Sequence, residues 1–246
     1  MSVTRRGRRR LYVISFAAVL GVGAPFWAPS LLGTLPVFRI ERVEIAGTVY
    51  ATPDELLELA AIEPTASVWS DGTTWEERVR SHPLVREARV RRTGMQDIEI
   101  RVTEVLPLAF VAGPTLVPVD ENGVALPLDP AEYALDLPVL AGDASLENGR
   151  VKGAGARDAL RALAALQEYD SAFFGQISEI RWLESGCVEI ELIEAGKTGK
   201  ILLRTSDPVK GLRLVELALG HASDLGVASA DARFEGQVVL NLREEG

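Results

Sequence analysis

One uncharged stretch near the amino terminus constrains this chain more than any other feature. Residues 11–38 are 28 consecutive positions without a charged side chain, and they directly follow five arginines within the first ten residues. A helix rises about 1.5 Å per residue, so about 20 residues cross the roughly 30 Å hydrocarbon core of a bilayer. The stretch therefore predicts a transmembrane helix over residues 11–35.

The arginine cluster predicts how this helix is oriented. By the positive-inside rule, residues 1–10 form a basic cytoplasmic tip and the bulk of the chain lies outside the cell membrane. A cleaved signal peptide has a similar start. However, the small residues Ala24 and Ala28 are each followed by a proline, which obstructs cleavage. We therefore expect an uncleaved single-pass anchor, kinked or shortened at Pro25.

The rest of the chain is acidic, with 21 basic against 35 acidic residues. Such a surface repels phosphates, so a role in binding nucleic acid is disfavoured. Cys187 is the only cysteine, which excludes an intrachain disulfide and a thiolate metal cluster. We expect no metal, cofactor or small-molecule substrate.

Residues 38–106 predict a small domain with the order β-α-α-β-β. Alternating apolar residues predict strands near 43–45, 88–90 and 98–102, with Gly94 in the turn between the last two. Thr52, Pro53 and Glu55 predict a helix start with a capping box, and a second helix begins near Thr73 and stops before Pro83. Two helices should pack on one face of a three-stranded sheet.

Residues 107–246 predict a larger, mostly antiparallel β domain with flanking helices, so the overall fold class is α+β. The Asn-Gly pair within 120–123 favours a tight hairpin turn. Apolar spacing predicts helices over 156–169 and 209–222. Strands are expected at 116–119, 124–126, 137–140, 177–183, 188–193, 201–204 and 231–242.

No catalytic constellation is evident. His82 ends a helix before a proline, and His221 ends another, so both are expected to be structural or solvated. Residues 196–198 (Gly-Lys-Thr) resemble the end of a phosphate-binding loop, but Glu191 stands where that loop requires glycine. Glu189 and Glu191 share one face of a strand and indicate a solvated surface. The sequence therefore predicts a protein that is not an enzyme.

Function without a catalytic site must come from a binding surface. An exposed sheet edge carries unpaired backbone N–H and C=O groups to which another chain can add a strand. The segment Phe234–Leu242 predicts such an edge strand near the carboxyl end, with Gly236 as a possible bulge. The alternative is a buried strand that only completes the core.

Four motifs resemble the FtsQ/DivIB cell-division family. Phe38–Gly47, and His82–Val85 leading into Ala88–Arg92, resemble a POTRA domain, which directly follows the predicted anchor. Asp120–Gly123 resembles the family's turn in the second domain, and Asp231–Val239 resembles its carboxyl-terminal signature. One departure is Gly94-Met95, where the family usually has Trp-Pro.

The resemblance implies a non-enzymatic scaffold of the division septum that links early and late division proteins. It implies that partners like FtsB/DivIC and FtsL, both single-pass proteins, bind the carboxyl-terminal sheet edge. A POTRA-bearing outer-membrane assembly or secretion factor is an alternative, but the charge-rich 140 residues after Leu106 lack the amphipathic strands of that class. The implied partner-binding residues are Phe234, Glu235, Gly236, Gln237, Val238 and Val239.

Overall fold

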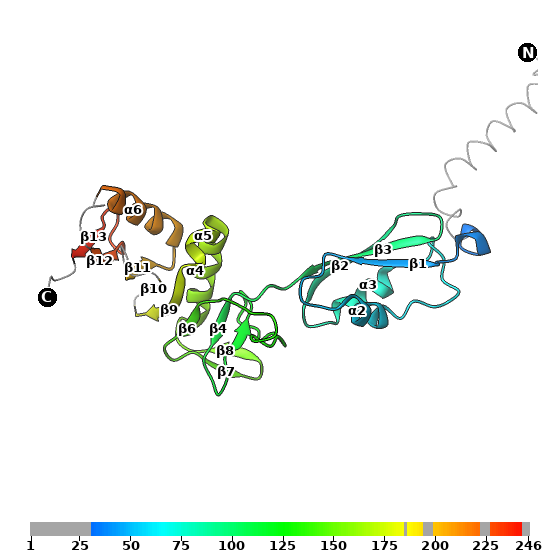
Figure 1. The fold of residues 1–246 in the computed structure, drawn as a ribbon, viewed down its shortest axis with the longest axis horizontal. Helices are drawn as coiled ribbons and strands as arrows, with labels where there is room; N and C mark the ends of the chain where they lie inside the picture. The colour runs from blue at the N-terminus through cyan, green and yellow to red at the C-terminus, as the bar shows by residue number, and fades with distance from the viewer. Residues whose placement is uncertain (1–30, 185, 194–198, 222–226, 243–246) are drawn as a thin grey trace, which may run out of the picture. The chain divides into compact units, whose positions relative to one another are not determined.

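The computed structural model describes residues 31–242, with gaps at 185, 194–198 and 222–226 (Figure 1). The chain divides into two compact units, the first ending at Glu104 and the second beginning at Val105. The predicted basic tip and most of the predicted transmembrane helix lie outside the described residues. Within the described part, no helix is both long and apolar enough to span a bilayer.

The first unit has the predicted order β-α-α-β-β. Strand β3 lies in the centre, parallel to β1 and antiparallel to β2. Both helices lie on one face of this sheet (Figure 1). Its elements are η1 (Pro36–Phe38), β1 (Arg42–Ala46), α2 (Pro53–Ala60), α3 (Thr73–Arg80), β2 (Val85–Arg92) and β3 (Asp97–Glu104).

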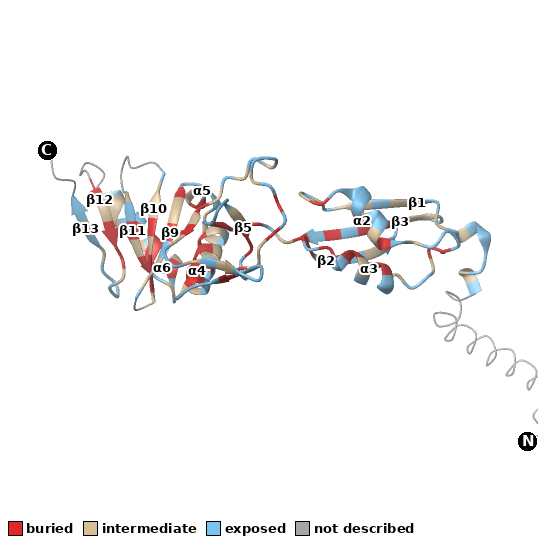
Figure 2. Cartoon of the chain, turned by 90° about the horizontal axis from the view of Figure 1, so that it is seen from below, coloured by how far each residue is buried: buried red, intermediate tan, exposed pale blue. Residues whose placement is uncertain are grey.

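Alternation along β3 builds the core of the first unit. Ile98, Ile100 and Val102 are buried, whereas Arg101 and Thr103 between and beyond them are exposed, as the period of two requires (Figure 2). The facing helices contribute the buried side chains of Leu56, Ala60, Trp75 and Val79.

The predicted capping box at α2 does not form. Thr52 does precede the helix and Pro53 is its first residue, but the Thr52 hydroxyl lies 3.5 Å from a Glu55 carboxylate oxygen and caps no backbone N–H. The preceding loop is held from another element instead. Glu104, buried at the end of β3, accepts the backbone N–H groups of residues 49, 50 and 51 at 2.9–3.0 Å.

Gly47 ends β1 in a conformation and a space that only glycine fits. Its φ is +90°, in the left-handed region, and a Cβ built there would lie 2.3 Å from the backbone oxygen of Val102. The close approach of these two backbones lets the chain turn from β1 into the loop that Glu104 holds.

The second unit contains most of the predicted elements at nearly the predicted positions. Helix α4 covers the expected residues, and α6 begins and ends one residue earlier than expected. The elements are β4 (Ala109–Val111), β5 (Val117–Val119), β6 (Val139–Ala141), β7 (Ser145–Glu147), β8 (Arg150–Lys152), α4 (Ala156–Tyr169), α5 (Ser171–Phe174), β9 (Ile177–Leu183), β10 (Cys187–Leu192), β11 (Lys200–Arg204), α6 (Pro208–His221), β12 (Val227–Asp231) and β13 (Val239–Leu242).

The large sheet of this unit has more antiparallel than parallel strand pairs, but it contains parallel pairs that the sequence did not predict. Its strand order is β13-β12-β11-β10-β9-β6-β4-β5, with four antiparallel and three parallel neighbours among the described residues. Two parallel pairs arise because a helix connects their strands: α4 lies between β6 and β9, and α6 between β11 and β12. A helical crossover returns the chain to the same end of the sheet, so the next strand runs parallel.

The predicted hairpin around residues 120–123 forms its turn but only one strand. Asp120 accepts the N–H groups of Asn122 and Val124, and Gly123 has a φ of +71°. The returning residues make isolated bridges from Val124 and Ala125 and form no strand of their own.

Helices α4 and α6 supply the apolar layer that packs on this sheet. Leu160, Leu163 and Leu166 of α4 are fully buried. Leu212 and Val215 of α6 are also almost completely buried. Fully burying a leucine-sized side chain contributes about 1.5–3 kcal/mol, so these helix faces contribute much of the unit's stability. The sheet therefore has one helix-covered face and one solvated face.

We expect Gly47→Ala to lower the free energy of unfolding by about 2–4 kcal/mol, because the new Cβ would overlap a backbone oxygen in a left-handed conformation. Gly149→Ala is the matched control: Gly149 also has a positive φ (+71°), but nothing lies within 4 Å of its Cβ position. Denaturant unfolding should show the smaller loss for the control. Equal losses would show that the Val102 contact is unimportant.

We expect Glu104→Ala to lower the free energy of unfolding by about 3 kcal/mol, since it leaves backbone donors without an acceptor. Glu104→Gln should lose less, because it retains one carbonyl oxygen. Hydrogen exchange checks the cause directly, since the amides of residues 49–51 should exchange faster in the alanine variant. Unchanged exchange at these amides would contradict the assignment.

Candidate functional site

Strand β13 forms one end of the large sheet. Among the described residues its only neighbour is β12, which runs antiparallel to it. The sequence placed an edge strand in this region, and the open side of β13 agrees with that expectation. A strand in this position presents backbone groups that another chain can pair with.

Hydrogen bonds on the inner side of β12 determine which groups of β13 are open. Ala232 donates its N–H to the carbonyl oxygen of Leu202, and the carbonyl oxygen of Ala228 accepts from Gly199, both at 3.0 Å. Ala228 of β12 and Ala232, which directly follows β12, thus direct these backbone groups toward β11. The residues that alternate with them on β12 therefore direct theirs toward β13.

Those alternating residues are Ser229 and Asp231, which stand opposite Asn241 and Val239 of β13. The backbone N–H and C=O groups of Val239 and Asn241 thus pair with β12. Leu240 lies between them, so its N–H and C=O point away from β12 to the open side. Leu240 is the backbone position best placed to receive an added strand.

The side chains of β13 divide between the two faces of the sheet. Leu240 stands opposite Ala230 and packs against the core, and Leu242 stands opposite Val227 on the same face but is 52% exposed. Val239 lies on the other face and is 45% exposed. The open edge therefore offers apolar surface beside its backbone groups.

The segment Phe234–Val238 is a loop, and the prediction that it belongs to the last strand is wrong. Gly236 has a φ of +69°, which ends the extended conformation, and the Gln237 N–H donates to Phe234 at 3.4 Å across a turn. Of the six predicted binding residues, the structure places only Val239 in the edge strand. Phe234, Glu235, Gly236, Gln237 and Val238 form the connection from β12 to β13.

A carboxylate–guanidinium pair fixes where this loop begins. Arg233 donates to both carboxylate oxygens of Asp231, at 2.9 and 2.6 Å, and its own N–H donates to the same carboxylate. The side-chain hydrogen bonds from Arg233 hold the pKa of Asp231 below its usual range, against the effect of burial. Arg204 of β11 donates to the Arg233 carbonyl at 2.5 Å, which ties the loop to the sheet.

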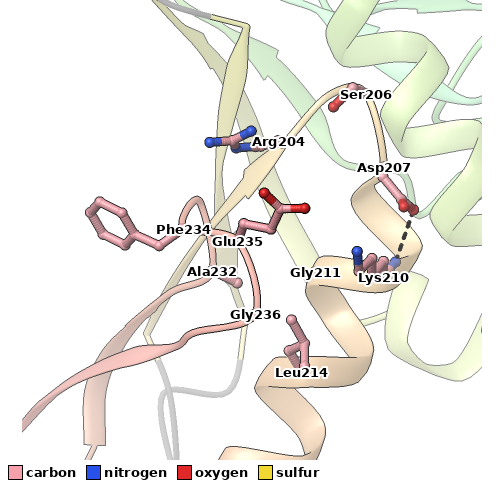
Figure 3. A pocket seen from close by; sticks show the side chains of 10 residues that line it. All are labelled: Arg204, Ser206, Asp207, Lys210, Gly211, Leu214, Ala232, Phe234, Glu235 and Gly236. Carbon is pink, nitrogen blue, oxygen red and sulfur yellow. Dashed lines mark hydrogen bonds between the residues drawn. The ribbon is translucent and has the colours of Figure 1, made fainter.

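A shallow hollow of about 210 Å³ lies between this loop and the start of α6 (Figure 3). Phe234 points away from the helix at its rim and is 51% exposed. The polar lining of the hollow includes Asp207, whose carboxylate accepts the backbone N–H of Lys210 at 3.2 Å. An exposed aromatic next to an open strand edge suits the recognition of another protein.

The other residues considered from sequence have structural roles in the described part of the chain. His82 is buried, accepts the N–H of Leu84 at 3.2 Å and lies 3.3 Å from Glu55. His221 is exposed and lies 2.7 Å from the carbonyl oxygen of Leu217. Residues 196–198 lie outside the described residues.

Glu189 and Glu191 project from the solvated face of β10, as expected. Both lie within ion-pair distance of Lys200 on the neighbouring strand, at 3.3 and 2.6 Å. The hydrogen bond from Lys200 lowers the pKa of Glu191. No group of three or more His, Cys, Asp or Glu side chains suited to a metal occurs among the described residues.

Sequence reasoning did not single out the residues that form the edge strand itself. Leu240, Asn241 and Leu242 were assigned to the strand but not to the binding site. The alternation Val-Leu-Asn-Leu was visible, but the direction of each backbone group depends on pairing with β12. That pairing is made across the loop of residues 232–238, and the turn of this loop at Gly236 is not revealed by a local apolar pattern.

Comparison with known proteins gives a consistent family. The model of the FtsQ-type POTRA domain matches residues 38–104. The cell division protein FtsQ of Myxococcus fulvus is 32% identical over 73% of this chain and 66% of its own length. FtsQ of Salinibacter ruber is 28% identical over 83% of both chains, and DivIB of Geobacillus kaustophilus is 28% identical over 60% of this chain and 54% of its own length.

The extracytoplasmic domain of the cell division protein DivIB from Geobacillus stearothermophilus is a solved structure similar to this chain. The match has 20% identity and a TM-score of 0.32, and it covers 50% of this chain and 97% of that domain. A score this low carries no argument on the fold. The chain spans just under two thirds of the Myxococcus protein and about half of the Geobacillus kaustophilus protein. Taken together, the matching POTRA model and the related sequences show that this chain belongs to the FtsQ/DivIB family of cell division proteins.

Proposed function

We propose that this chain is a non-enzymatic scaffold of the bacterial division septum. A single helix at residues 11–35 anchors it in the cell membrane, with residues 1–10 in the cytoplasm. Outside the membrane, a POTRA domain (38–106) and a β domain (107–246) link early and late division proteins. Family membership supports the role in division, and the uncharged stretch after the arginine cluster supports the anchor.

The binding event that we propose is strand addition to β13. The occupant is a pair of single-pass division proteins like FtsB/DivIC and FtsL, one of which extends a strand along the open edge. The single observation that carries this proposal is that β13 ends the sheet with one side unpaired among the described residues. The backbone of Leu240 gives affinity, and the side chains around it give specificity.

The exposed residues of the loop complete the surface. Phe234 and Val239 are apolar and about half exposed. Glu235 lies beside them, and Gly236 leaves open space where a side chain would stand. We therefore keep the six predicted residues, Phe234 to Val239, in the proposed interface, with Gly236 leaving space for the partner, and add Leu240 as the backbone part.

Two other functions have less support. An outer-membrane assembly or secretion factor with a POTRA domain is not favoured, because the relatives that match are named as division proteins. A metal-dependent hydrolase would need a group of metal ligands, and no group of three or more such side chains occurs among the described residues. The proposed scaffold is tested by recovery of the FtsB- and FtsL-like proteins on the full-length chain, and by its recruitment to midcell.

The proline variant Leu240→Pro should weaken partner binding at least about tenfold, because it removes the outward N–H and fills its place with a ring. Leu240→Ala is the side-chain control, since it keeps the N–H; its binding should fall less. Titration calorimetry with the purified partner pair measures both. Proline on the open side of an edge strand should leave the melting temperature close to that of the alanine variant.

A proline at the next position, Asn241, should destabilise the fold, unlike the proline at Leu240. Asn241→Pro removes a donor to β12, so it should lower the melting temperature well below that of Leu240→Pro. If Leu240→Pro is instead the less stable variant, Leu240 faces β12 and the proposed edge geometry is wrong.

Phe234, at the rim of the hollow, should contribute strongly to partner binding. We expect Phe234→Ala to reduce affinity by about 2 kcal/mol, as truncation of a central aromatic often does. The melting temperature should change little because the ring is half exposed. Leu217→Ala on α6 is the control, since Leu217 is also exposed but lies on a helix. Equal affinities for both variants would remove Phe234 from the interface.

A further inference from the structure

One end of the first unit carries a group of exposed apolar side chains. Met95, in the turn between β2 and β3, is 61% exposed. Three more exposed apolar residues belong to the segment that leads into the sheet: Leu31, Leu35 and Val37. Leu31 and Leu35 belong to the predicted anchor, so Val37 and Met95 are the exposed apolar side chains of this end that the anchor itself does not explain.

The turn and the entering segment are joined by hydrogen bonds. The carbonyl oxygen of Gln96 accepts the N–H of Glu41 at 2.8 Å and that of Arg42 at 3.3 Å. Met95 therefore lies next to the residues through which the chain enters β1. Figure 1 shows η1 at the end of the sheet where β1 and β3 begin.

The segment between the predicted anchor and the first unit is too short to let the unit move far from the membrane. Phe38 accepts the N–H of Val68 at 2.9 Å, and Ile40 donates to Ala66 at 3.0 Å, so the chain is fixed to the unit from residue 38 onward. Two residues, Pro36 and Val37, separate the predicted end of the anchor at residue 35 from Phe38, and the three Cα-to-Cα steps span at most about 10 Å. The headgroup region on each side of a bilayer is about 5–8 Å thick. This end of the unit must therefore lie at the membrane surface.

Aromatic and cationic groups stand beside the apolar ones. The Phe38 ring contacts the Trp69 ring edge to face, with 5.9 Å between their centroids. The guanidinium of Arg92 lies 3.7 Å from the centroid of the Trp69 ring. Tryptophan and arginine both suit the boundary between headgroups and acyl chains.

The acidic groups at this end are engaged with neighbours. Glu41 accepts a hydrogen bond from the Gln96 amide at 2.6 Å, and Asp97 lies 3.7 Å from Arg42. Arg39 is exposed beside them. Glu41 keeps its negative charge, but the exposed Arg39 and Arg42 lie beside it in sequence, so this end of the unit does not present a block of acidic side chains alone to anionic lipid.

We propose that this end of the POTRA domain docks into the surface of the bilayer that anchors the chain, with Met95 as its apolar tip. The inference rests on the membrane anchor of the proposed function. Met95 and Leu35 bury their side chains at the headgroup–acyl boundary, and Arg39 and Arg92 face lipid phosphates. Docking would limit how far the POTRA domain tilts from the membrane, and so restrict where it meets other division proteins.

A depth measurement on the full-length chain tests this proposal. A nitroxide is attached at Met95→Cys in a Cys187→Ala background, and the protein is reconstituted into vesicles of phosphatidylethanolamine and phosphatidylglycerol. Collision with oxygen and with a water-soluble nickel chelate reports the depth of the label. We expect a label about 5–10 Å inside the boundary, as for other interfacial apolar groups.

The control label is Val49→Cys in the same background. Val49 is also exposed, but its N–H donates to Glu104, at the opposite end of β3 from Asp97. This label should collide freely with the nickel chelate. Equal accessibility of the two labels in a chain that resists carbonate extraction would overturn the docking and leave the anchor intact. A chain that carbonate removes from the vesicles would overturn both.

Discussion

The pairing of β13 with β12 is the interaction on which this account depends. It fixes the last strand at the end of the sheet and assigns each of its backbone groups to one side. Val239 and Asn241 are used within the chain, which leaves Leu240 facing outward. The Asp231–Arg233 pair and the bond from Arg204 hold the loop that delivers β13 to this position. The proposed strand addition needs such a rigidly presented edge.

The helical crossovers explain why the edge is both stable and open. Helix α6 joins β11 to β12 and covers the sheet up to that region, so β12 is held by tertiary packing. Beyond it, β13 has a neighbour on one side only, among the residues that the structure describes. Leu242 lies on the helix-covered face but remains half exposed. The inner strands of the sheet are therefore supported by helix packing, whereas β13 has one side without a neighbouring strand among the described residues.

Local sequence patterns predicted the elements better than their pairing. The 3.6-residue period of residues 156–169 marked α4 to the residue, and the order of the POTRA-type unit followed from alternation and proline positions. The three parallel pairs of the large sheet were not predicted, because strand direction depends on what connects the strands. The predicted capping box does not form, and the loop before α2 is held instead by Glu104, which lies about fifty residues away in sequence and so outside any local pattern. Gly236 was noted as a bulge, but its positive φ ends the extended segment altogether.

Amide hydrogen exchange of the chain, alone and with its bound division partners, tests the central claim most directly. In the free chain the Leu240 amide should exchange much faster than the Val239 and Asn241 amides, which donate to β12. Partner binding should slow the Leu240 amide specifically and leave its two neighbours almost unchanged. A Leu240 amide already protected in the free chain, or unaffected by the partner, would contradict the proposed strand addition.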